Sequence, residues 1–149
     1  MYHSNRLRKG RHSQRGSLYL LTTTTTDRHP ILRDVAFGRA VVAEFKAAQL
    51  DGWADSLAWV VMPDHLHWLI ALGDSSLDQL MRRVKTNSAR VINRQRGITG
   101  ALWQTGYHDR ALRQEEDVQA VARYVVANPL RAGLVDRLGD YSLWDAIWL

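Results

Sequence analysis

The sequence predicts an α+β sandwich in which helices pack on one face of an antiparallel sheet. Two observations lead to this fold class. β-branched and apolar runs alternate along the chain with longer stretches in which apolar residues recur at helical spacing. The chain also has no internal repeat and no composition shift that marks a linker. We therefore expect all 149 residues, 1–149, to form one domain that begins with a basic segment, 1–16.

The first half of the chain is predicted to supply a strand, a helix and a pair of strand segments. Residues Ser17 to Thr26 are rich in β-branched and aromatic side chains, which favours a strand. Apolar residues then follow helical spacing from about Leu32 to Leu50, and Asp51-Gly52 ends this helix. Trp59 to Leu72 forms two strand segments interrupted by Pro63-Asp64. These segments are either a hairpin or one broken strand.

The second half is predicted to add a helix, more strand and a third helix. The second helix runs from about Ser76 to Gln95, and Gly97 ends it. Leu102 to Arg113 is expected to form a strand pair around Gly106. The third helix begins at acidic residues, which complement the helix dipole, and ends near Asn128 because a proline follows. This order of elements is that of a ferredoxin-like or RRM-like sandwich.

Composition and charge exclude several classes of protein. The chain has no cysteine, which excludes a disulfide framework, a zinc finger and a cysteine nucleophile. It also has no apolar run of the roughly 18 residues that a membrane helix needs, so we expect a cytoplasmic protein. The net charge is +5, and the first sixteen residues hold five basic residues and no acidic one. These basic residues are Arg6, Arg8, Lys9, Arg11 and Arg15. The segment is either a contact for a polyanion or a solvated tail.

Two histidines form the strongest local signal for chemistry. His65 and His67 are two apart in an apolar strand segment, so both side chains project from the same face. Leu66 and Trp68 project from the other face, which is expected to be core. Paired imidazoles are a natural start for a metal site, although one core histidine and one exposed histidine would give the same spacing.

The third helix offers a nucleophile and a further ligand. Tyr124 and Asn128 are four apart, so a helix would place them on one face. A phenol is a poor nucleophile until a nearby cation or base favours its ionised form. A packing tyrosine and a polar residue at a helix end would explain the same two positions.

Three ordered motifs resemble the Y1 transposases of IS200/IS605 type, and within them the REP-associated tyrosine transposases. The motifs are VMPDHLHWLI, LWQTGYHDRALR and ARYVVANPLRAGLV, and the N-terminal GRHSQRGSLYLLT is similar to the REP-associated pattern. The resemblance extends from about Arg8 to Val135. It implies a histidine-hydrophobe-histidine endonuclease with a C-terminal tyrosine-bearing helix near its metal site.

The resemblance also implies roles for individual residues. His65, His67 and Asn128 would bind a divalent metal, Mg²⁺ or Mn²⁺ by ligand type. Tyr124 would attack a phosphodiester and form a 5′-phosphotyrosine link. Tyr107 is the competing nucleophile, ranked lower because no ligand lies one turn away from it. The roles of His108, Asp109 and Arg110 stay open.

Single-stranded DNA hairpins formed by REP palindromes are the partners that the resemblance implies. The basic segment from Arg6 to Arg15 would contact the hairpin foot and an adjacent guide sequence. The second helix carries a basic face that either contacts phosphates or is simply solvated; it includes Arg82, Arg83, Lys85 and Arg90. We expect a monomeric, nucleoid-associated enzyme, with a dimer as the alternative. A domesticated protein that binds hairpins without cutting them is the alternative function.

Overall fold

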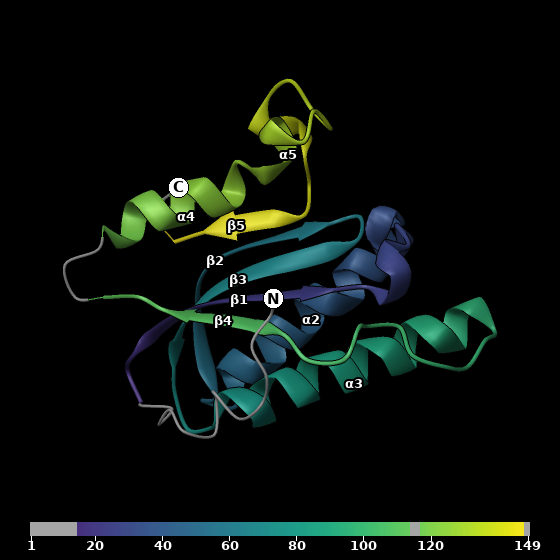
Figure 1. Cartoon of the computed structure of the whole chain (residues 1–149), viewed down its shortest axis with the longest axis horizontal. Helices are drawn as coiled ribbons and strands as arrows, with labels where there is room; N and C mark the ends of the chain where they lie inside the picture. The colour runs from purple at the N-terminus through teal and green to yellow at the C-terminus, as the bar shows by residue number, and fades with distance from the viewer. Residues whose placement is uncertain (1–14, 114–116, 148–149) are drawn as a thin grey trace.

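The computed structural model describes residues 15–113 and 117–147, which form a five-stranded antiparallel sheet with helices on both faces (Figure 1). The strands are β1 Leu18–Thr24, β2 Ala54–Met62, β3 His65–Leu72, β4 His108–Ala111 and β5 Trp144–Ala146. The helices are α2 Val35–Leu50, α3 Leu77–Arg96, α4 Val118–Val126 and α5 Asn128–Arg131. Three short 3₁₀ helices are η1 Thr26–Arg28, η2 Ile31–Arg33 and η3 Leu138–Asp140. The predicted α+β class is confirmed.

The sheet has the strand order β4-β1-β3-β2-β5, with β3 at its centre. The Pro63-Asp64 turn joins β2 to β3 and leaves Met62 opposite His65, so the two predicted segments are a hairpin. β1 pairs with the other side of β3 and sets Thr22 opposite His67. This register surrounds the histidine end of β3 with a strand on each side.

The α2 and α3 layer covers one face of the sheet and forms the main core. Alternate residues of β3, from Leu66 to Leu72, are buried against these helices. Trp68 stacks on Phe45 of α2, with 4.3 Å between ring centroids, and its indole N–H donates to the Ser56 hydroxyl at 2.8 Å. Such aromatic pairs are stabilised by about 0.5–1.5 kcal/mol beyond their area of burial. The core face predicted from strand alternation is confirmed.

Local signals define both ends of α3. Ser76 accepts from the Gln79 backbone N–H, and the Gln79 side chain accepts from the Ser76 N–H, which completes a capping box. Gly97 ends the helix in the left-handed region with φ +70°, where a residue with a side chain is strained. The predicted helix over Ser76 to Gln95 is therefore confirmed to within a residue.

The strand pair predicted around Gly106 is wrong. Only β4 is a strand there, and Trp103 makes a single bridge to Thr25. The Lys85 ammonium group donates to the Gln104 and Gly106 carbonyls, both at 2.7 Å. These carbonyls are held by a side chain of α3, so the segment is fixed as a loop.

The C-terminal tail contributes β5, which extends the sheet along β2. Three residues from Trp144 to Ala146 pair with the stretch from Ala58 to Val60. A strand this short has no usable periodicity, so no strand is predicted there from the sequence.

The α4 and α5 layer covers the other face of the sheet (Figure 1). Val125 of α4 packs with Val60 and Met62, the strand neighbours of His67 and His65. The third helix was predicted to continue to about Asn128, but α4 ends at Val126 and the chain bends at Ala127. No helix among the described residues is long and apolar enough to span a bilayer.

Candidate functional site

His65 and His67 lie together on the α4 side of β3, as predicted. Their ring centroids are 5.0 Å apart, and the rings meet edge to face. Both side chains are half-buried, while Leu66 between them is fully buried on the opposite face. The interpretation of the pair as one core histidine and one exposed histidine does not fit this arrangement.

Each imidazole is oriented by a hydrogen bond at Nδ1. His65 Nδ1 lies 2.7 Å from the Asp64 carboxylate, and His67 Nδ1 lies 2.8 Å from the Thr22 hydroxyl. Metal-binding histidines typically use one ring nitrogen for such a partner and the other for the metal. Nε2 of each ring is then the atom that remains for a ligand.

The surroundings of His67 and Asp64 lower the pKa of both groups. Burial is the main cause that lowers the pKa of His67 to about 4, and the charges of His65 and Arg131 lower it further. The ring is therefore neutral at neutral pH, as a metal ligand must be. Burial alone would raise the pKa of Asp64. The His65 hydrogen bond and the charges of His65 and Arg28 outweigh burial and lower that pKa.

Tyr124 is the most exposed tyrosine among the described residues. Tyr124 is 62% exposed on α4. The next residue, Val125, packs against Val60 and Met62 of β2, the strand that pairs with the histidine-bearing β3. Tyr19 is buried at 3% exposure. The Tyr141 hydroxyl donates to the Val61 carbonyl at 2.6 Å, and burial raises its pKa. Neither of these two phenols is open to a large substrate.

Tyr107, the competing nucleophile, lies in the opposite layer. It is only 6% exposed and belongs to the core under α2 and α3. Its hydroxyl donates to the Asp78 carboxylate at 2.6 Å. A phenol in this position is separated from His65 and His67 by the sheet itself.

Asn128 does not lie on the same helix as Tyr124, which departs from the prediction. It opens α5 after the bend at Ala127, and its Nδ2 donates to the Val125 carbonyl at 3.1 Å. Because Nδ2 makes this hydrogen bond, the amide oxygen Oδ1 is the atom of Asn128 that can coordinate a cation.

The residues present fit a divalent ion by the chemistry of their donors. Two imidazole nitrogens and one amide oxygen are a mixed nitrogen and oxygen set. Within residues 15–113 and 117–147, no cluster of three or more histidine or acidic side chains could hold an ion. A metal would therefore need the amide oxygen, water or substrate oxygens to complete its coordination.

The basic residues divide into two groups. Arg6, Arg8, Lys9 and Arg11 lie outside the described residues, and Arg15 forms an ion pair with Asp74. On α3, Arg83 pairs with Asp51 at 2.6 Å and lies over the Trp53 ring, while Lys85 holds the two loop carbonyls. These two side chains serve the fold, so they are poor candidates for the phosphate contacts considered above.

The residues of the LWQTGYHDRALR motif whose roles were left open, His108, Asp109 and Arg110, differ in burial. Asp109 is buried, and the pairing of β4 with β1 sets it opposite Leu21, which belongs to the α2 and α3 core. His108 and Arg110 are exposed. Asp109 therefore faces away from the histidine pair.

Three residues at the site have no role among the sequence-based predictions. Asp64 was treated only as a turn residue, although its position next to His65 was a usable signal. Arg131 lies on α5, beyond the bend at Ala127, so its spacing of seven from Tyr124 along one straight helix did not predict their contact. Thr22 lies forty-five positions from His67, and no local pattern links two residues that only strand register brings together.

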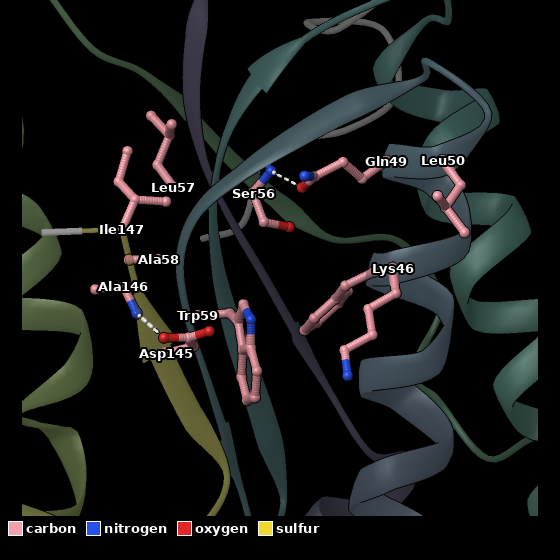
Figure 2. A pocket seen from close by; sticks show the side chains of 11 residues that line it. Lys46, Gln49, Leu50, Ser56, Leu57, Ala58, Trp59, Asp145, Ala146 and Ile147 are labelled. Carbon is pink, nitrogen blue, oxygen red and sulfur yellow. Dashed lines mark hydrogen bonds between the residues drawn. The ribbon is translucent and has the colours of Figure 1, made fainter. Parts of the chain in front are cut away.

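A cavity lies elsewhere, between α2, β2 and β5 (Figure 2). It encloses about 420 Å³ and is lined by side chains that include Lys46, Trp59 and Asp145. None of the predicted site residues borders it. The cavity and the histidine pair are separate features.

Comparisons with solved structures agree with this fold. A REP-associated tyrosine transposase bound to a REP hairpin superposes with a TM-score of 0.73 at 20% identity, over 90% of this chain and 79% of that chain. A transposase structure from Deinococcus radiodurans R1, described as putative, has a TM-score of 0.54 at 21% identity, over 79% of this chain and 97% of that one.

Comparisons with curated sequences give relatives of the same kind. The REP-associated tyrosine transposase of Escherichia coli K12 is 28% identical over 86 residues, which are 56% of this chain and 49% of that protein. The chain thus spans about half the length of this relative. A Haemophilus influenzae protein described as a putative REP-associated tyrosine transposase is 23% identical over 142 residues, 85% of this chain and 78% of its own. The family model described as "Transposase IS200 like" matches residues 14–128, well over half of the sequence. The chain belongs to the IS200-like transposase family.

Proposed function

We propose that this protein nicks and rejoins single-stranded DNA through a 5′-phosphotyrosine intermediate at Tyr124. The observation that carries the proposal is the placement of an exposed tyrosine on the helix that packs beside the paired histidines. The other tyrosines of the described residues are buried or bonded through their hydroxyls. Membership in a transposase family supports the same class of reaction.

The reaction exchanges one phosphodiester for another. The Tyr124 oxygen forms a bond to phosphorus, its proton passes to solvent, and the bond from phosphorus to the 3′-oxygen breaks. The 3′-oxygen leaves as a hydroxyl after it takes a proton from water. The tyrosyl ester keeps the energy of the broken bond, so rejoining needs no external energy source.

His65, His67 and Asn128 would hold a divalent ion, Mg²⁺ or Mn²⁺. When bound, the ion would polarise the scissile phosphate and stabilise charge on the leaving oxygen. Asp64 and Thr22 orient the two rings through the Nδ1 hydrogen bonds described above. This division of labour explains why the turn aspartate and the strand threonine border the site.

The proposed substrate is a DNA hairpin formed by a palindromic repeat. A related solved structure contains a REP hairpin, and the curated relatives are described as REP-associated. The basic residues Arg6, Arg8, Lys9, Arg11 and Arg15 are the proposed contacts for the hairpin and its flanking sequence. We propose a monomer that acts on chromosomal DNA in the cytoplasm.

Covalent adduct formation tests this function directly. The protein is incubated with Mn²⁺ and a labelled oligonucleotide that carries the host's palindromic repeat, and the products are separated on a denaturing gel. We expect a protein–DNA band that disappears with EDTA and in Tyr124→Phe, while Tyr107→Phe, the matched control, keeps it. A native-gel shift without any covalent band would instead identify a hairpin-binding protein that does not cut.

A further inference from the structure

Arg131 interacts with both halves of the site. The carbon at the centre of its guanidinium group lies 3.7 Å from the centroid of the Tyr124 ring. Its charge is also one of the causes that lower the pKa of His67, which places it within electrostatic range of that histidine. The positive charge of Arg131 therefore lies near both the proposed nucleophile, Tyr124, and the proposed metal ligand His67.

The backbone around Arg131 holds this position. Its N–H donates to the Ala127 carbonyl at 3.0 Å, and buried Pro129 anchors the same short helix. The Leu134 N–H donates to the Pro129 carbonyl at 3.0 Å. Side chains on helices lean towards the N-terminal end, which is the direction in which Tyr124 lies from Arg131.

Arg131 contacts an aromatic ring, whereas several other described arginines contact a carboxylate. Five others form ion pairs with aspartates: Arg15, Arg28, Arg83, Arg123 and Arg137. Among the described residues, Arg131 forms no ion pair with a carboxylate, and its guanidinium group lies over the ring of Tyr124. A guanidinium group stacked on a ring through its own face keeps its N–H donors at the edge, where they can meet an anion.

We propose that Arg131 binds the scissile phosphate while it positions the Tyr124 ring for attack. This inference rests on the proposed function and adds a residue that the paired histidines and the tyrosine do not include. Its guanidinium donors would bind the non-bridging phosphate oxygens, which gain negative charge as the tyrosine oxygen approaches phosphorus. A fixed cation at that point stabilises the transition state more than the ground state.

The test compares Arg131→Gln with Arg123→Gln, which removes the same charge from the residue next to Tyr124. Single-turnover adduct formation is measured with saturating hairpin DNA and Mn²⁺. We expect Arg131→Gln to lower this rate by about 10²- to 10³-fold. Arg131→Lys should recover part of the loss because it keeps the charge without the planar fork. Arg123→Gln should stay within about twofold of wild type, since its side chain pairs with Asp117.

Two further readouts separate phosphate binding from a structural role. Hairpin affinity, measured in a Tyr124→Phe background, should change less than about threefold, because one phosphate contact among several is lost. A neutral methylphosphonate at the scissile position should shrink the rate difference between wild type and Arg131→Gln, since the bound charge is reduced. A full difference on that substrate would assign Arg131 a purely structural role and overturn the proposal.

The outcomes for Arg131 and for the proposed function are distinct. An Arg131→Gln rate within twofold of an active wild type would overturn the role of Arg131 and leave the nuclease intact. A wild type that forms no adduct on any hairpin would overturn the proposed function, and the role of Arg131 would fall with it.

Discussion

The two faces of the central strand β3 differ in what they contact, although they belong to the same eight residues. One face presents Leu66, Trp68 and Ile70 to α2 and α3, and all three are fully buried. The other face presents His65 and His67 beside α4, half-buried and hydrogen-bonded. Strand alternation thus lets one segment build the core and the site at once, and substitutions on the two faces should have separable effects.

The largest expected effect belongs to the histidine face. His65→Ala and His67→Ala should each lower the rate of adduct formation by about 10³-fold or more, because metal stabilisation of the phosphate is worth several kcal/mol. The melting temperature should change little, since neither ring belongs to the main core. Rates close to wild type in both variants would contradict a role for the pair in the reaction.

Trp68→Ala, one position beyond His67, tests the core face. The side chain is fully buried and stacked on Phe45, so its loss should lower the free energy of unfolding by about 3–5 kcal/mol. Urea denaturation measures this loss. The measurement is made without DNA and metal, because bound ligands would stabilise the folded state and hide the difference. The molecules that stay folded should retain the adduct rate per active site. A stable Trp68→Ala protein with no activity would break the separation of the two faces.

The low pKa of His67 predicts a pH dependence of stability. The folded pKa is about 4, whereas the usual value is 6.5, so the unfolded state binds more protons between these values. Stability is therefore full above the unfolded pKa and is lost as the pH falls towards the folded one, by up to about 3 kcal/mol. Unfolding measured in EDTA should show this loss, and His67→Gln should flatten it. An equally steep loss in His67→Gln would assign the effect to other groups.

The smallest effect is expected at the threonine that orients His67. Thr22→Val removes the hydroxyl bonded to Nδ1 and should weaken Mn²⁺ affinity or the adduct rate by about 10- to 100-fold. Thr24→Val is the matched control on the same strand face, and it should have a smaller effect because its hydroxyl is not bonded to His67. Equal effects in the two variants would remove the special role of the Thr22 hydrogen bond.

The predictable part of the fold rests on local signals. The helices α2 and α3 follow from apolar periodicity and from the glycines that end them. The Pro63-Asp64 interruption predicts the two strand segments of β2 and β3, but it left open whether they form a hairpin or one broken strand. β5 and the loop around Gly106 escaped prediction because long-range pairing and the Lys85 contacts define them. Strand alternation likewise predicts that His65 and His67 share a face, and it needs no tertiary information.

The remaining parts of the site depend on register and on the bend after α4. Thr22 meets His67 only because β1 pairs with β3 in one register. Asn128 was assigned to the tyrosine helix from a spacing of four, but the bend at Ala127 places it on α5. Arg131 reaches the Tyr124 ring through that same bend. Spacing along one ideal helix does not capture such a change of direction.

The central claim is that Tyr124, on the α4 side of the sheet, carries the covalent chemistry. Tandem mass spectrometry of the trapped protein–DNA adduct, after digestion with protease and nuclease, tests this claim most directly. We predict that the nucleotide remnant lies on Tyr124, in the peptide that follows Arg123. A remnant on Tyr107 would place the chemistry on the opposite side of the sheet and contradict the account.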